Sequence, residues 1–549
     1  MPVNDQIPVD LLHWLLALLP IGALGVLMVR FRWTAQQAGA VASVAAAAVA
    51  LIAFRAAPGD VAIAGAKGVW DALSILFVIW AALLIHEVMS QAGGYEALRL
   101  ALTRMSDNEM FDVLALGWVF TSFLQGIVGF GTPIAIVAPL LVAFGMRPVY
   151  AVVIPLIAHI WAKFYGTLAE GWLATLQVVE IDEVTAASAA LQAALLLMIP
   201  VFMGGFAVVW MYGRAAAVRH AWPLVLVIGA IHGLGQVAVT LFDPMLAGFL
   251  PATVAMFALY PLSRWPRFAK PALNIVTRPA MRTRAQGESA DREPPMGAMM
   301  SLFPYILLTV LALGTAAIPA VKAALERLRF GLPFPEVTTG YGVTSEAAAQ
   351  YSPIAPLTHP AAALVLAALV TWWVYHRRGY YAEWARVTGT EPKGVPHALL
   401  AGAVPASVPI FAFLVMASVM NHSGQNATLA LGVASIAPGY VVAFLSNGIG
   451  VLGAFTTSSS TSSNLLFADL QLSLARLKGL PEASILAAQS AGGAIGNAIA
   501  PANLVMGAST VGISGQESAI LRKTGPWTLV AFVLTGVATV VLVLVSSRE

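Results

Sequence analysis

The chain has 549 residues, of which 59% are hydrophobic and only 10% are charged. Soluble proteins carry roughly 25% charged residues, so this composition excludes a soluble globular protein and predicts an integral membrane protein. The net charge of +3 is small, and the absence of cysteine excludes disulfides, thiolate metal sites and redox pairs. No basic domain or nucleic-acid motif is present, and we expect neither a nucleic-acid partner nor a cofactor.

Apolar windows of about 20 residues, the length that spans a bilayer as a helix, recur along the whole chain. The N-terminal MPVNDQIPVD lacks the positive leader of a signal peptide, so the first window is expected to be a retained helix. We predict an all-α polytopic membrane protein with about 12 transmembrane helices. These spans are expected at residues 8–29, 34–54, 69–92, 148–168, 184–212, 220–243, 244–261, 298–321, 359–376, 396–420, 483–500 and 526–545.

Two further regions, 110–144 and 438–475, are long enough to cross the bilayer but contain polar or glycine-rich breaks. The first break is QGIVGFGTP (Gln125–Pro133), and the second is a run of Ser and Thr. Irregular backbone at membrane depth survives only inside protein or beside a wet cavity, and transporters build substrate sites from such discontinuous helices. We therefore predict two re-entrant hairpins, each returning to the side from which it entered.

With the hairpins re-entrant and the N-terminus outside, most Lys and Arg residues fall on the inner side, as the positive-inside rule requires. Both termini then lie outside, and the two hairpins enter from opposite sides, the pattern of an inverted-topology repeat. The predicted domains are a first repeat at 1–261, a basic cytoplasmic linker at 262–297 and a second repeat at 298–549.

The second break, AFTTSSSTSSNLLF (Ala454–Phe467), places nine consecutive polar residues between apolar flanks. The helical arm that follows would point its free N–H groups at this cluster, and a helix N-terminus binds anions. Hydroxyl and carbonyl oxygens at Thr457, Ser460 and Asn464 could instead ligate Na⁺. A third reading is an ordinary Ser/Thr-rich surface loop.

Three ionisable residues inside apolar segments are functional candidates. His159 and Lys163 are four residues apart, hence on one face of the predicted 148–168 helix, and Lys163 could balance a substrate carboxylate. The alternative is that Lys163 snorkels to the interface, with Glu170 as its surface partner. Asp469 is a candidate proton or ion site in the second hairpin.

Three stretches resemble the L-lactate permease family, whose members carry lactate and glycolate across bacterial inner membranes. They are FLQGIVGFGTPIAIVAPLLVAFGMRPVYA (Phe123–Ala151), GVLGAFTTSSSTSSNLLFADLQ (Gly450–Gln471) and AAQSAGGAIGNAIAPANLVMGASTVGISGQES (Ala487–Ser518). The resemblance implies a multi-pass inner-membrane protein that takes up a 2-hydroxy monocarboxylate together with a proton.

The chain departs from the family pattern at charged positions. The family usually has Glu where this chain has Gln125, often Asp where it has Ser460, and Lys where it has Asn497, while Lys163 is an added cation. The predicted coupling residues are His159, Asp469 and Ser460. The predicted substrate-binding residues are Gln125, Gly129, Phe130, Gly131, Thr132, His159, Lys163, Ser459, Ser460, Thr461, Ser462, Asn464, Gln489 and Asn497.

The preferred function is therefore proton-coupled transport of L-lactate or a related 2-hydroxy monocarboxylate by alternating access. The neutral Gln125 and Ser460 leave open a Na⁺-coupled carrier of a different carboxylate or a sulfonate. A channel or a membrane-embedded enzyme is disfavoured, because the sequence has no catalytic triad, metal-ligand motif or continuous polar pore pattern.

Overall fold

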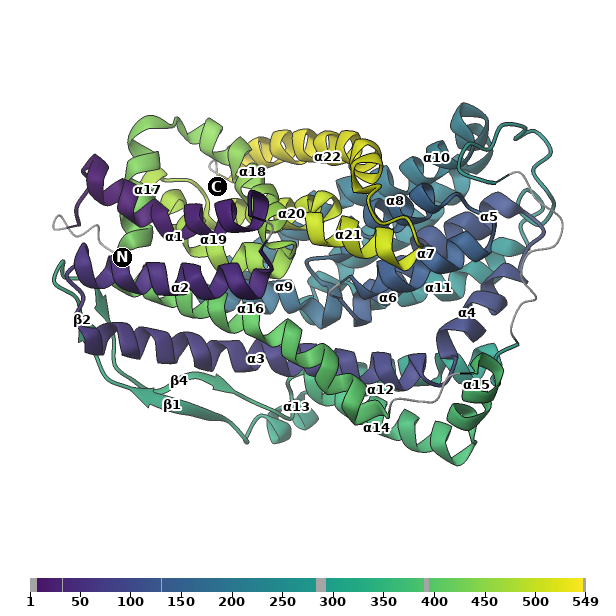
Figure 1. Ribbon diagram of the computed structural model, residues 1–549, viewed down its shortest axis with the longest axis horizontal. Helices are drawn as coiled ribbons and strands as arrows, with labels where there is room; N and C mark the ends of the chain where they lie inside the picture. The colour runs from purple at the N-terminus through teal and green to yellow at the C-terminus, as the bar shows by residue number, and fades with distance from the viewer. Residues whose placement is uncertain (1–6, 32, 130, 283–292, 390–393, 547–549) are drawn as a thin grey trace.

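The computed structural model describes residues 7–31, 33–129, 131–282, 293–389 and 394–546. The longer helices lie side by side along the long axis of the molecule (Figure 1). The elements up to the linker are α1 (Leu11–Val29), α2 (Ala35–Ile52), α3 (Pro58–Ser90), α4 (Gly94–Thr103), α5 (Glu109–Leu114), the π-helix η1 (Ala115–Phe120), α6 (Thr121–Ile127), α7 (Thr132–Ala143), α8 (Pro148–Ala158), the 3₁₀ turn η2 (Ile160–Ala162), α9 (Gly166–Val178), α10 (Glu183–Thr240), η3 (Pro244–Leu246) and α11 (Phe249–Ser263).

After the linker, two helices and four short strands precede a second set of long helices. These elements are α12 (Ala298–Ala317), α13 (Pro319–Leu325), β1 (Phe330–Phe334), β2 (Val337–Thr338), β3 (Thr344–Ser345), β4 (Ala348–Ile354), α14 (Pro360–Arg377), α15 (Tyr380–Thr388), α16 (Val395–Ser423), α17 (Gln425–Ile436), α18 (Gly439–Thr457), α19 (Ser460–Lys478), α20 (Glu482–Gly496), η4 (Asn497–Ile499), α21 (Pro501–Thr510) and α22 (Glu517–Ser546).

Each predicted span overlaps a helix. Among the described residues, nine helices are long and apolar enough to cross a membrane, namely α1, α2, α3, the α5–α6 segment, α10, α12, α16, α18 and α22. α10 has 58 residues and bends at Gly213 and Arg214, so it contains the two spans predicted at 184–212 and 220–243. The chain is therefore a multi-pass membrane protein, as its composition indicates.

The prediction of one continuous helix over 148–168 is wrong. α8 ends at Ala158, and Thr167, Leu168 and Ala169 adopt left-handed backbone angles before the regular part of α9. Tertiary packing sets this break: a Cβ on Gly166 would lie 2.6 Å from the Gln125 backbone oxygen. The break is thus fitted against the first predicted hairpin.

The predicted 483–500 helix is also interrupted. α20 gives way to the η4 turn and then to an extended Ala500 before Pro501. Proline disfavours the helical conformation at the residue before it, so the local sequence accounts for this break. The glycines of α20 pack it against α18, because Cβ atoms on Gly492 and Gly496 would lie 2.0 and 2.3 Å from backbone oxygens of that helix.

Both predicted hairpin regions consist of two helical arms that pack against each other across a break. The two ends of the first region contact the same segment after α11: Glu109 pairs with Arg278 at 2.8 Å, and the Arg147 N–H donates to the Ala280 carbonyl. The ends of the second region also meet, since a Cβ on Gly439 would lie 3.3 Å from the Leu480 side chain.

The all-α prediction needs one amendment in the 322–358 segment, which was expected to be a loop outside the membrane. It forms two small antiparallel sheets, β1 with β4 and β2 with β3. Leu332 pairs with Tyr351 in the first sheet, which runs alongside α3 in Figure 1. The strands, the N-terminus and the C-terminus lie toward one end of the molecule, whereas α4, α5 and α15 lie toward the other (Figure 1).

Candidate functional site

The breaks of both hairpin regions and of both interrupted helices meet at one small polar cavity, which we name the central cavity. Its volume is about 40 Å³, room for only a few water molecules. The residues that line it are Gln125, Gly129, Gly131, Lys163, Thr167, Glu170, Ser458, Ser459, Ser460, Thr461, Asn497 and Asn503. Segments more than 300 residues apart in the chain therefore build one polar site.

Three helices begin at the central cavity. Gly131 and Ser459 are the N-cap residues of α7 and α19, and α21 begins two residues before Asn503. The first turn of a helix leaves its N–H groups without intrahelical partners, and the helix dipole adds partial positive charge there. Several of these N–H groups already donate, Thr132 to the Gly129 carbonyl and Ala502 to the Ser458 hydroxyl, so it is the dipoles of the three N-termini that favour an anionic ligand.

Lys163 and Glu170 are the charged residues of the central cavity. Both side chains are buried, with 7% and 4% of their surface exposed, and they interact electrostatically. Within the described parts of the chain, however, neither forms an ion pair within 4.0 Å. Their burial rules out the alternative in which Lys163 snorkels to the interface with Glu170 as a surface partner.

Gln125 and Glu170 approach each other across Gly129. The Gln125 Nε2 and Glu170 Oε2 atoms each lie 3.7 Å from the position that a Cβ on Gly129 would take. Oε1 of both side chains is buried without a hydrogen-bond partner in the structure. Buried polar atoms are rarely left unpaired, so both oxygens are available to accept a hydrogen bond from a ligand, and the Glu170 carboxylate could also take up a proton.

Side-chain amides and hydroxyls hold the break between α18 and α19, which is the tip of the second predicted hairpin region. Ser458 adopts φ +58°, and the Ser459 hydroxyl accepts from the Ser462 N–H at 3.1 Å. The Asn497 side chain donates to the Ser458 carbonyl at 3.2 Å, and Asn503 donates to the Asn497 side chain at 2.8 Å. The interrupted α20–α21 helix therefore positions the tip of the Ser/Thr run.

Several predicted site residues lie outside the central cavity. His159 caps the end of α8 with its ring against the Pro155 carbonyl, so it does not share a helix face with Lys163 as predicted. Gln489 donates to Ser463, and Asn464 donates to the Gly171 carbonyl; both serve packing between helices. Thr132 and Ser462 sit in the first turns of α7 and α19 without lining the cavity, and Phe130 lies outside the described residues.

The predicted coupling residues are also separated. Of the three proposed Na⁺ ligands, Ser460 lines the central cavity, whereas Thr457 and Asn464 do not. The Thr457 hydroxyl donates instead to the Gly453 carbonyl of its own helix. Asp469 lines a different cavity and accepts from Asn426 at 2.8 Å. The structure thus does not gather Thr457, Ser460 and Asn464 around one cavity.

Four residues that line the central cavity were not predicted from the sequence as site residues: Glu170, Thr167, Ser458 and Asn503. Glu170 carried a usable signal, since it is a carboxylate in the apolar stretch GTLAEGW (Gly166–Trp172). Treating 148–168 as one helix placed Glu170 beyond the membrane, which hid that signal.

A polar cavity at the meeting point of discontinuous helices, in a multi-pass protein, is typical of membrane transporters. The sequence profile of the L-lactate permease family matches residues 13–546, and the chain belongs to that family. It is 28% identical to the glycolate permease GlcA of Escherichia coli, covering 96% of this chain and 94% of that one.

Two further relatives support the same family. The L-lactate permease of Salmonella typhi is 27% identical, with 96% of this chain and 95% of that one covered. The L-lactate permease of Bacillus subtilis is 27% identical, with coverage of 87% and 86%. These relatives carry the names of transporters and not of enzymes.

Two solved structures show weak similarity to the chain. The YdaH transporter of Alcanivorax borkumensis has a TM-score of 0.42 and 16% identity, with 86% of each chain covered. MtrF of Neisseria gonorrhoeae has a TM-score of 0.39 and 14% identity, with coverage of 84% and 80%.

Proposed function

We propose that the protein is a secondary active transporter that imports L-lactate or a related 2-hydroxy monocarboxylate by proton symport with alternating access. The observation that carries this proposal is the central cavity, in which Lys163 and three helix N-termini offer positive charge to a carboxylate. Glu170, in the same cavity, takes the role of the proton carrier. The names of the relatives support lactate or glycolate as the substrate class.

The proposed topology is that of an inverted repeat in a bacterial inner membrane. Each half contains a two-armed region with its ends close together, followed by an interrupted helix. This supports two re-entrant hairpins, a first repeat at 1–261, a cytoplasmic linker at 262–297 and a second repeat at 298–549. Both termini are proposed to be outside, at the end of the molecule away from α4, α5 and α15 (Figure 1).

Cysteine labelling tests this topology directly, because the chain has no cysteine of its own. Asp107→Cys and Arg147→Cys, at the two ends of the first hairpin, are expected to react with a membrane-impermeant maleimide only from the cytoplasmic side. Ser435→Cys and Lys478→Cys, at the ends of the second, are expected to react only from outside. Labelling of the two ends of either hairpin from opposite sides would contradict the re-entrant arrangement.

The function is tested by uptake of radiolabelled L-lactate into proteoliposomes, with a pH gradient and a Na⁺ gradient imposed separately. Accumulation driven by the pH gradient and abolished by a protonophore supports the proposal. Accumulation driven only by Na⁺ would favour the Na⁺-coupled alternative, and uptake that never exceeds equilibrium would favour a channel. No lactate uptake under either gradient would require a competition panel of other carboxylates and sulfonates.

A further inference from the structure

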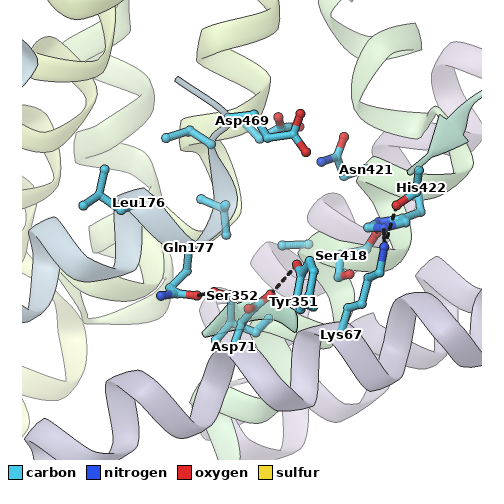
Figure 2. A pocket seen from close by; sticks show the side chains of 16 residues that line it. Lys67, Asp71, Leu176, Gln177, Tyr351, Ser352, Ser418, Asn421, His422 and Asp469 are labelled. Carbon is cyan, nitrogen blue, oxygen red and sulfur yellow. Dashed lines mark hydrogen bonds between the residues drawn. The ribbon is translucent and has the colours of Figure 1, made fainter. Parts of the chain in front are cut away.

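A second cavity lies apart from the central one, and we name it the Lys67 cavity. Its volume is about 210 Å³, larger than that of the central cavity. α3, the end of α9, the β1–β4 segment, the end of α16 and α19 all contribute to its wall. Figure 2 shows Lys67, Asp71, Tyr351, Asn421, His422 and Asp469 around its space.

Lys67 is a buried cation in this wall, with only 2% of its surface exposed. Its Nζ donates to the Ser345 hydroxyl at 2.6 Å and lies 3.5 Å from His422 Nε2. The other ring nitrogen of His422 lies 2.8 Å from the Ser418 carbonyl, which makes Nδ1 the donor and leaves Nε2 as an acceptor for Lys67. In the described part of the chain, no carboxylate forms an ion pair with Lys67 within 4.0 Å.

One turn along α3, Asp71 offers the complementary group. Its side chain accepts from the Tyr351 hydroxyl at 2.9 Å through Oδ2, whereas Oδ1 is buried without a partner. Residues four apart on a helix have Cβ atoms roughly 5–6 Å apart. Lys67 and Asp71 therefore present a cation and an unused acceptor side by side on one wall of the cavity.

The Lys67–Asp71 pair matches a 2-hydroxy acid better than a simple anion. The carboxylate of the 2-hydroxy acid accepts from the Lys67 ammonium group, and the hydroxyl on its adjacent carbon donates to the Asp71 carboxylate. Asn421 and Ser418 are further polar residues that line the cavity. Asp469, on the opposite side of the space in Figure 2, is already bonded to Asn426.

The helices α9 and α19 each line both cavities, and α19 does so with Ser460 at the central cavity and Asp469 at the Lys67 cavity. α9 carries Glu170 at the central cavity and Gln177 at the Lys67 cavity. At 1.5 Å per residue, these positions are about 10 Å apart along the axis. On the proposed topology, the Lys67 cavity is on the outer side, between the external solution and the central cavity.

We propose that the Lys67 cavity is a second, outer binding site for the substrate, in which Lys67 binds the carboxylate and Asp71 accepts from the 2-hydroxyl. This inference rests on the proposed transport function. It adds a place where substrate is captured before it reaches Lys163.

The first test is the kinetics of L-lactate uptake by Lys67→Gln. Because the hydrogen bond lost is charge-assisted, KM is expected to rise about tenfold, while the maximal rate stays close to that of the wild-type protein. Lys322→Gln is the matched control, since Lys322 is an exposed lysine on α13, outside both cavities. In the Asp71→Asn variant, unlabelled L-lactate and propionate are compared as inhibitors of radiolabelled L-lactate uptake. Inhibition by L-lactate is expected to weaken more than inhibition by propionate, which lacks the hydroxyl.

A structural role for Lys67 makes a different prediction. If Lys67 only holds the β3 strand through Ser345, Ser345→Ala would raise KM as much as Lys67→Gln does, and that result would overturn the proposal. An unchanged KM in Lys67→Gln, beside normal wild-type uptake, would overturn the outer site alone. Absence of wild-type lactate uptake would instead overturn the proposed function on which it rests.

Direct binding separates the two cavities. In purified Lys163→Gln protein, whose central cavity lacks its cation, radiolabelled L-lactate is expected to bind still, with weak affinity and a strong dependence on salt. Adding Lys67→Gln is expected to abolish that residual binding. Residual binding that survives in the double variant would place the second site elsewhere.

Discussion

Replacing Lys163 with glutamine is expected to abolish L-lactate accumulation while leaving the protein folded in the membrane. The side chain is 7% exposed and lies among three helix N-termini, where it would form the single full positive charge facing the substrate. Without Lys163 the bound substrate carboxylate would be a buried charge without its partner, which costs about 3–5 kcal/mol and corresponds to roughly a hundredfold or greater loss in kcat/KM. Initial rates of uptake in proteoliposomes, normalised to the amount of inserted protein, measure this loss.

Lys523→Gln provides the control for a lost lysine. That residue lies 3.2 Å from the Tyr150 hydroxyl and away from both cavities, so its replacement is expected to leave uptake near the wild-type rate. Lys163→Arg keeps the charge but changes its shape, and it is expected to retain binding with reduced turnover. Normal uptake by Lys163→Gln would mean that the helix N-termini alone hold the carboxylate.

The two hairpin breaks were predictable because local sequence determines them. At the second, nine polar residues between apolar arms cannot continue a lipid-facing helix. At the first, Gly131 adopts φ +78° directly before Thr132 and Pro133, a combination that local sequence alone favours. Ser460, Thr461 and Gly129 could therefore be predicted as neighbours, and they do line the central cavity.

The break after α8 could not be predicted in this way. Thr167, Leu168 and Ala169 have no intrinsic preference for left-handed angles, and they adopt them where the chain packs against the first hairpin. Because of this break, Glu170 lies in the central cavity and not at the surface, where an unbroken helix would have placed it. The Lys67 cavity could not be predicted for a similar reason. Ser345 and Tyr351 form hydrogen bonds with Lys67 and Asp71 of α3, but they come from a segment whose sequence predicts only a loop.

Replacing Glu170 with glutamine is expected to uncouple transport from the proton gradient. Glutamine resembles the protonated acid in shape but cannot release a proton, so the loaded carrier still crosses while the proton no longer accompanies each cycle. For one proton per substrate, a gradient of one pH unit supports about tenfold accumulation, since 1.4 kcal/mol is a factor of ten. Glu170→Gln is expected to show no accumulation above equilibrium, yet to keep lactate–lactate exchange near the wild-type rate.

A second substitution tests whether proton coupling needs a carboxylate in the central cavity or needs it at the position of Glu170 on α9. Gln125 stands where the family usually has Glu, and its Nε2 atom and the Glu170 Oε2 atom flank the same point beside Gly129, each at 3.7 Å. Adding Gln125→Glu to the Glu170→Gln variant therefore returns a carboxylate to the same cavity, and proton-driven accumulation is expected to recover. Gln125→Asn is the matched control, because it alters the same position without adding a charge. If Glu170→Gln alone still accumulated lactate, the proton would have to be carried elsewhere, and Asp469 and His159 would be the next carboxylate and imidazole to replace.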